Sequence, residues 1–100
     1  MPTKSYDQFM ITKLQDSELA AEYLSVALEQ GSVNQFLIAL RNVAEAHGGI
    51  GTLSDITDLN RQSMYKMLSE EGNPTLANLL AVLRALGISV KFTPSEREAA

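Results

Sequence analysis

The segment Thr52-Leu53-Ser54-Asp55-Ile56-Thr57-Asp58-Leu59-Asn60-Arg61-Gln62-Ser63-Met64-Tyr65-Lys66-Met67-Leu68-Ser69 is the most informative stretch of the sequence. It predicts a short helix, a tight turn and a second helix that begins after the N-cap Asn60. The apolar residues that would hold the two helices together are Leu53, Ile56, Leu59, Met64 and Leu68. This spacing predicts a helix-turn-helix over about residues 51–70.

The second helix of this segment has one apolar side and one polar side. On a helical wheel the inward residues are Met64, Met67 and Leu68. The outward and flanking residues are Arg61, Gln62, Ser63, Tyr65, Lys66 and Ser69. Glutamine can bind adenine through two hydrogen bonds, and arginine or lysine can bind guanine, so this side suits the major groove of DNA. A solvated polar face on a helical hairpin is the alternative, and the wheel alone leaves both open.

Three further helices flank this pair. Their starts carry side chains that can cap the first turn: Asp16, Ser32 and Thr75. Their ends carry glycines: Gly31, Gly48 and Gly87. The Ser32–Gln35 spacing is that of a reciprocal capping box. The chain is therefore expected to be all-α, with five helices.

The two ends of the chain are expected to be extended. Residues 1–15 are assigned as an N-terminal arm, because Phe9–Leu14 alternates imperfectly between apolar and polar positions. Residues 88–93 alternate cleanly and predict a short strand that ends before Pro94. Residues 16–100 are then a single helix-turn-helix domain that opens with an acidic helix over 16–30.

The composition excludes several classes of protein. The chain has 100 residues, no cysteine and a single histidine, so thiol chemistry and a histidine-based metal site are not expected. No apolar run reaches the length of about 18 residues that a membrane helix needs. The only catalytic-looking motif is the S-x-x-K of Ser63–Lys66, and the partner motifs that it requires are missing. We expect a cytoplasmic protein without enzyme activity, cofactor or metal.

The net charge of −4 argues against a general nucleic-acid binder. Any contact with DNA would depend on a small local cluster of cations, and two copies of the chain would be needed to supply enough of them. Residues 1–32 contain two lysines against five acidic residues. This acidic first third favours a basic partner.

Six stretches of the chain together resemble a known group of regulators. The resemblance to the Cro and phage-repressor type of DNA-binding domain, the lambda-repressor-like class, is carried by Asp58–Tyr65, Gly72–Leu76 and Leu83–Gly87. A narrower resemblance to addiction module antidote proteins, the HigA-like antitoxins, is carried by Leu14–Leu24, Ala27–Gly31 and Ala39–Ala46. It implies a homodimeric antitoxin that neutralises a RelE/HigB-type toxin and represses its own operon by binding double-stranded operator DNA.

The sequence departs from the pattern at the turn, where Asp58 stands in place of the usual glycine. Aspartate tolerates a left-handed backbone better than most residues, so we expect the turn to form. Two other functions fit the same residues. One is a free-standing phage-type repressor, and the other is a protein-interaction module that has lost DNA binding.

Three sets of candidate site residues follow. The expected DNA-binding residues are Thr52, Asn60, Arg61, Gln62, Ser63, Tyr65, Lys66, Ser69, Asn73, Thr75 and Asn78. The expected toxin-binding residues form one stripe on the acidic helix: Glu18, Glu22, Ser25 and Glu29. The expected dimer contacts come from the last helix and the strand: Ala81, Val82, Ala85, Ile88, Val90 and Phe92.

Overall fold

The computed structural model describes residues 4–96, and this range contains six α-helices and no strand. In chain order they are α1 (Lys4–Leu14), α2 (Ser17–Gln30), α3 (Val33–Ala46), α4 (Gly49–Thr57), α5 (Arg61–Met67) and α6 (Leu76–Ala85). The predicted all-α class is confirmed. Predictions for residues 1–3 and 97–100 lie outside the described residues.

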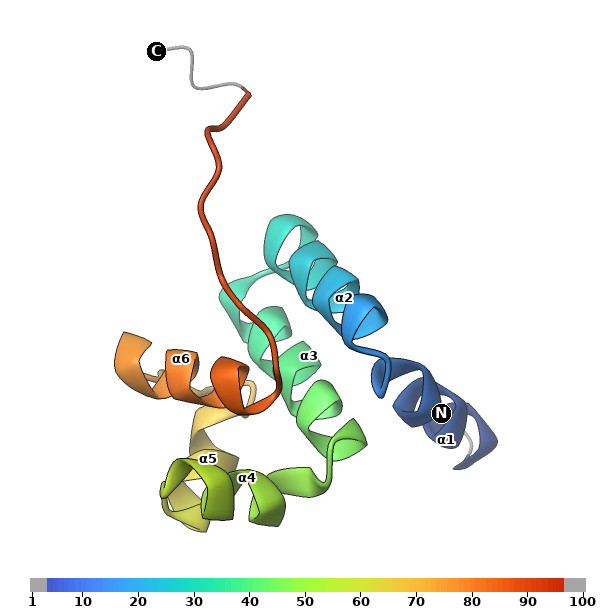
Figure 1. Ribbon diagram of the computed structural model, residues 1–100, viewed down its shortest axis with the longest axis vertical. Helices are drawn as coiled ribbons and strands as arrows, with labels where there is room; N and C mark the ends of the chain where they lie inside the picture. Colours follow the sequence, from blue (N-terminus) through green and yellow to red (C-terminus); the bar gives the residue numbers. More distant parts are fainter. Residues whose placement is uncertain (1–3, 97–100) are drawn as a thin grey trace.

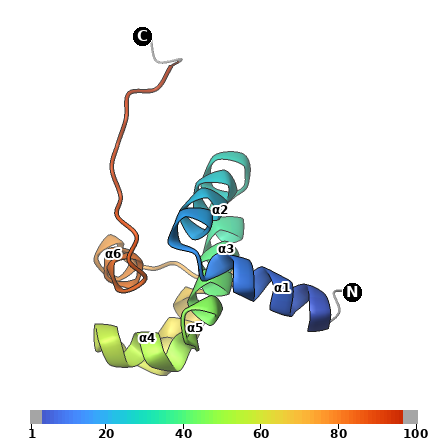
Figure 2. The same cartoon turned by 45° about the vertical axis from the view of Figure 1, so that its right-hand side comes forward.

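The central element of the fold is α3, which has α1 and α2 on one side and the group α4 to α6 on the other (Figure 1, Figure 2). Seven of its residues are buried: Phe36, Leu37, Ala39, Leu40, Val43, Ala44 and Ala46. A helix that is apolar over such a wide arc needs neighbours on several sides. The core is completed from the other elements by Leu14, Ala20, Leu24, Ile50, Leu53, Met64, Met67, Leu68, Val82, Leu83 and Leu86.

The predicted N-caps are confirmed by side-chain hydrogen bonds at Asp16, Ser32, Asn60 and Thr75. The cap of α3 is a reciprocal capping box. Ser32 Oγ accepts from the backbone N–H of Gln35 at 3.1 Å, and Gln35 Oε1 accepts from the N–H of Ser32 at 3.2 Å. These bonds satisfy donors that the first turn of a helix leaves unpaired.

The prediction of an extended arm over residues 1–15 is wrong, because Lys4–Leu14 forms α1 and raises the number of helices from five to six. Met10 and Leu14, four residues apart, both pack toward the core, which is the spacing of a helix. Phe9 is 57% exposed, so the apparent alternation of the segment did not reflect burial.

A hydrogen bond from α3 holds the end of α1 in place. The ring Nε2 of His47 donates to the carbonyl oxygen of Leu14 at 3.0 Å. The last carbonyls of a helix have no hydrogen-bond donor within that helix. His47, the C-cap residue of α3, donates to a carbonyl at the end of α1 and not to the end of α3.

The predicted strand over residues 88–93 does not form in the single chain. Ile88 remains attached to the last turn of α6, where its N–H donates to the carbonyl of Leu83 at 2.9 Å. Beyond it the segment runs away from the helices as an exposed tail (Figure 1). A strand needs a partner for its backbone hydrogen bonds, and the described part of this chain offers no second extended segment.

Candidate nucleic-acid interface

Helices α4 and α5 are joined by a turn of three residues, Asp58 to Asn60. The backbone of Asp58 has φ 64° and ψ 20°, which is the left-handed region that glycine occupies freely. Asp58 is the only residue other than glycine with a positive φ among the described residues. The expectation that aspartate can hold this turn is confirmed.

Side chains on both sides of the turn fix the direction in which α5 leaves α4. Ser54 Oγ donates a hydrogen bond to the carbonyl of Leu59, and the N–H of Leu59 donates to Thr57 Oγ1 at 3.3 Å. Asn60 Oδ1 then accepts from two backbone N–H groups in the first turn of α5 at 2.8 and 3.2 Å. These hydrogen bonds fix the conformation of the turn and therefore the orientation of the exposed face of α5.

The left-handed backbone at residue 58 gives a prediction on stability. Asp58→Gly should be more stable than Asp58→Ala by about 1 kcal/mol. A left-handed residue with a Cβ costs roughly 1–2 kcal/mol, while the greater freedom of glycine in the unfolded chain offsets about 0.4–1 kcal/mol of that difference. Urea unfolding followed by helical circular dichroism measures it. Equal stabilities would contradict a left-handed turn.

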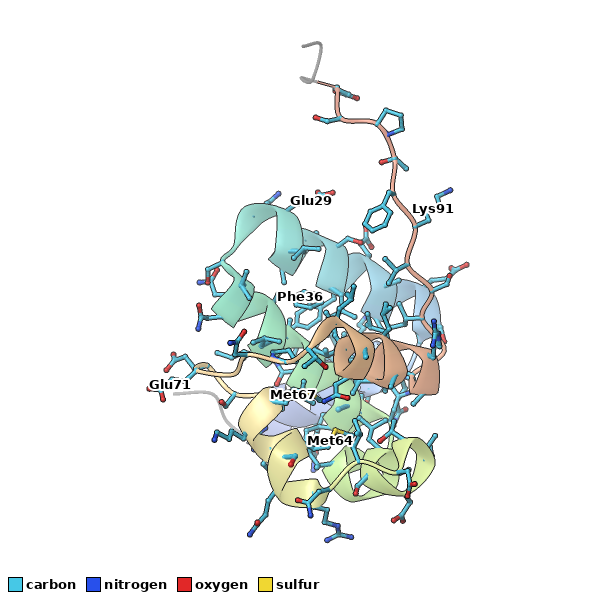
Figure 3. All side chains as sticks on the ribbon, turned by 90° about the vertical axis from the view of Figure 1, so that its left-hand side faces the viewer. Glu29, Phe36, Met64, Met67, Glu71 and Lys91 are labelled. Atoms are coloured by element: carbon cyan, nitrogen blue, oxygen red, sulfur yellow. The ribbon has the colours of Figure 1, made fainter. Side chains whose placement is uncertain are left out.

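Helix α5 has the predicted division into a buried and an exposed side. Met64 and Met67 are buried in the core together with the C-cap residue Leu68 (Figure 3). The exposed side chains are those of Arg61, Gln62, Ser63, Tyr65 and Lys66. Polar and cationic groups of this kind lie on one short helix at the surface, where a ligand as large as a DNA duplex can reach them.

Four of the expected DNA-binding residues have side chains engaged with the backbone of this chain. Thr52 Oγ1 donates to the carbonyl of Gly48 at 3.0 Å, and Ser69 Oγ donates to that of Lys66 at 2.8 Å. Asn60 and Thr75 cap α5 and α6. These four residues position the helices, and the remaining candidates have the freer side chains.

Five of the expected DNA-binding residues line a groove between α5 and the start of α6. It has a volume of about 400 Å³. The expected residues that line it are Ser63, Lys66, Asn73, Thr75 and Asn78. The other candidates do not line this groove: Thr52, Asn60, Arg61, Gln62, Tyr65 and Ser69. Polar contacts could therefore extend from α5 to the loop before α6 and to its first turn.

Two residues near α5 were missed by the sequence reasoning. The guanidinium of Arg41, on α3, lies over the Tyr65 ring, 5.4 Å from its centroid, and adds a cation beside the exposed face of α5. Gly51, on α4, leaves room for Arg61, since a Cβ there would lie 2.7 Å from Arg61 Nη2. Both depend on contacts between helices, which no local pattern in the sequence reports.

The expected toxin-binding residues Glu18, Glu22, Ser25 and Glu29 are all exposed. They lie on the side of α2 opposite its buried residues Ala20 and Leu24. The structure thus places the whole acidic stripe at the surface of one helix.

The residues expected to form dimer contacts differ in how exposed the structure leaves them. Val82 is 0% exposed and belongs to the core, so it has no surface to offer a second copy. Ala81, Ala85 and Ile88 are half-buried. Val90 and Phe92 lie on the tail and are 51% and 96% exposed. Of the expected contacts, the tail residues are the most accessible.

No group of three or more histidine, cysteine, aspartate or glutamate side chains is arranged to hold a metal ion among the described side chains, residues 8–96. Within the same residues, no helix has the length and apolar character required to cross a bilayer.

Comparisons with known proteins show a family and a relative to which this chain is similar. The family described as "Probable addiction module antidote protein" matches residues 3–94. A relative named "Uncharacterized protein" from Haemophilus influenzae (strain ATCC 51907 / DSM 11121 / KW20 / Rd) is 30% identical over 73 residues. That alignment covers 73% of this chain and 74% of the relative. No solved structure matches the chain.

Proposed function

This chain belongs to the family of probable addiction module antidote proteins, and from that premise we propose that it neutralises a RelE/HigB-type toxin and represses its own operon. In this proposal α4 and α5 act as a helix-turn-helix, with α5 in the major groove of operator DNA. Two copies bind together. The role of an antidote is regulatory and needs no catalytic group.

One observation carries the DNA-binding part of the proposal. Gln62 and Lys66 are exposed on the side of α5 away from its buried methionines, and Arg61 is exposed at the N-terminal flank of the helix. Among the described side chains, residues 8–96, these three have no hydrogen bond or ion pair. Glutamine can read adenine, and the two cations can bind guanine or phosphate. Half or more of the contacts in such complexes go to phosphate and sugar, which Ser63 and Asn73 could supply from the neighbouring groove.

The test is a titration of a duplex taken from the DNA upstream of this gene, at several salt concentrations. We expect tight binding that weakens steeply as salt rises, because each phosphate contact releases counterions. An unrelated duplex of equal length is the control. Equal, weak binding to both duplexes would favour a protein-interaction module that does not read DNA.

The proposed dimer accounts for the exposed tail. If two tails pair antiparallel with Val90 opposite its counterpart, Ile88 faces the partner's Phe92 on one side of the ribbon. On the other side Lys91 faces the partner's Ser89, so no like charges oppose each other. The backbone N–H and C=O groups of one tail would then form hydrogen bonds with those of the tail in the second copy.

We therefore expect the protein to be a dimer at micromolar concentration and the double variant Val90→Ser, Phe92→Ser to be a monomer. Both side chains are at least half exposed, so the helical domain should keep its stability. Light scattering measures the mass. The matched control is Ser89→Ala with Thr93→Ala, on the polar side of the same tail. A wild-type monomer, or a variant that dimerises as well as the wild type, would contradict the pairing.

A further inference from the structure

A second groove lies on the part of the molecule formed by α1, α2 and α3. It has a volume of about 590 Å³. Its apolar lining comes mainly from Met10, Leu19, Tyr23, Val26, Ala27 and Ile38. Leu19, Val26 and Ile38 remain 40%, 45% and 38% exposed, so the groove is an apolar surface open to solvent.

The spacing of these residues suits an elongated ligand. Leu19 and Val26 are seven residues apart, which places them two turns apart on the same side of α2. Ile38 reaches the groove from α3. Two exposed apolar residues along one helix, with a third on its neighbour, form the kind of groove that receives the apolar side of an amphipathic helix or strand.

The charge beside the groove is negative. Glu22 lines it, and Glu18 and Glu29 continue the same stripe of α2. Among the described side chains, residues 8–96, these three carboxylates have no hydrogen bond or ion pair. Lys13 also lines the groove, and its ammonium lies over the Phe9 ring, 5.2 Å from the centroid. Glutamates four residues apart destabilise a helix slightly, so the stripe does not serve the stability of α2.

We propose that this groove and its acidic stripe bind the toxin of the module through a basic, amphipathic segment of that toxin. The inference rests on the proposed function, since the antidote role supplies the partner. Apolar side chains of the segment enter between Leu19, Val26 and Ile38, and its lysines or arginines face Glu18, Glu22 and Glu29.

The acidic stripe excludes two other occupants. DNA is repelled by it. A second copy of this chain, placed across the groove by two-fold symmetry, would bring two acidic stripes together and cost free energy through like-charge repulsion. A basic protein partner is the occupant that both the apolar groove and its charged edge favour.

The groove is also separate from α5. In both ribbon views α2 and α5 lie on opposite sides of α3 (Figure 1, Figure 2). With side chains drawn, Glu29 of α2 and Met64 of α5 lie toward opposite ends of the molecule (Figure 3). A toxin seated on α2 therefore leaves the exposed face of α5 open to DNA.

The experiment takes the purified product of the gene adjacent to this one as the candidate toxin and measures its binding at low and high salt, by calorimetry and by association kinetics. The first variant carries Glu18→Lys, Glu22→Lys and Glu29→Lys. It should bind at least tenfold more weakly and associate more slowly at low salt, with a smaller loss at high salt because salt screens these charges. The control variant makes the same change in charge at three exposed acidic residues that do not line the groove, Asp55, Glu70 and Glu71, and should bind as the wild type does.

A second pair of variants tests the apolar part. Leu19→Gln with Val26→Gln should weaken binding at least tenfold at every salt concentration, because burial of apolar surface is little affected by screening. The control, Ile56→Gln with Leu76→Gln, changes residues that are 60% and 69% exposed outside the groove. Circular dichroism checks that every variant is folded.

The outcomes separate the two proposals. If the wild type does not bind the neighbouring protein, the antidote function proposed for this module fails, and the groove assignment fails with it. If the wild type binds and both groove variants bind equally well, the groove assignment alone is overturned. Loss of binding in both groove variants, with both controls unchanged and binding of upstream DNA retained, supports it.

Discussion

Replacing Gln62 and Lys66 together with alanine is expected to abolish binding to the upstream DNA while leaving the thermal stability nearly unchanged. Both side chains are exposed on α5 and have no hydrogen bond or ion pair among the described side chains, residues 8–96. Each lost base contact is worth about 1–3 kcal/mol, and a dimer loses it twice. Exposed substitutions of this kind change the free energy of unfolding by less than about 0.5 kcal/mol.

The measurement is fluorescence anisotropy of the labelled duplex, with melting followed in parallel. A matched control removes one amide and one cation at the end of α1, through Lys13→Ala and Gln15→Ala, and should bind DNA as the wild type does. If the α5 variant binds its own upstream DNA with unchanged affinity and salt dependence, then α5 is not the helix that reads DNA.

Met64→Ala is expected to have the largest effect on stability among changes to α5. The Met64 side chain is 0% exposed and anchors α5 to the core. Removing a buried side chain of this size costs about 2–5 kcal/mol, which is a large part of the roughly 5–15 kcal/mol that stabilises a typical domain. DNA binding should fall as well, because α5 loses the contact that sets its position.

Leu76→Ala is the comparison for that variant. Leu76 is also apolar and helical but is 69% exposed, so its truncation should change the free energy of unfolding by no more than about 0.5 kcal/mol. Urea unfolding of the two variants side by side gives the difference. If both lose the same amount of stability, the burial of α5 described above is wrong.

Features that depend on neighbours in the sequence were predictable. The N-caps at Ser32, Asn60 and Thr75 use residues within three positions of the capped backbone. The left-handed turn at Asp58 and the inward side of α5 also follow from local spacing. In each case the interacting atoms are close along the chain, so the pattern contains the necessary information.

Features that depend on partners distant in the sequence were missed. The sequence pattern predicts an extended arm where α1 forms, because the apolar side of α1 is recognised only through the α2 and α3 surfaces that cover it. The segment over residues 88–93 has the pattern of a strand but lacks a partner strand in the described chain. An alternating pattern shows that a segment is compatible with a strand, but a strand forms only where another extended segment is available to pair with it.

The features of the candidate sites also differ in whether the local sequence predicts them. The polar side of α5 and the acidic stripe of α2 follow from helical wheels, and the structure places both at the surface. Arg41 beside Tyr65, the groove before α6 and the apolar groove between α1, α2 and α3 are made by residues far apart in the sequence. They required the packed structure.

Together the two proposals give one chain two separate binding surfaces, α5 for DNA and the α1–α3 groove with its acidic stripe for the toxin. A single experiment mixes this protein, the product of the adjacent gene and the upstream duplex, and measures the mass of the product by size-exclusion chromatography with light scattering. We expect one complex that contains all three components. Release of the DNA whenever the second protein binds, or release of the second protein whenever DNA binds, would show that the two surfaces are not separate.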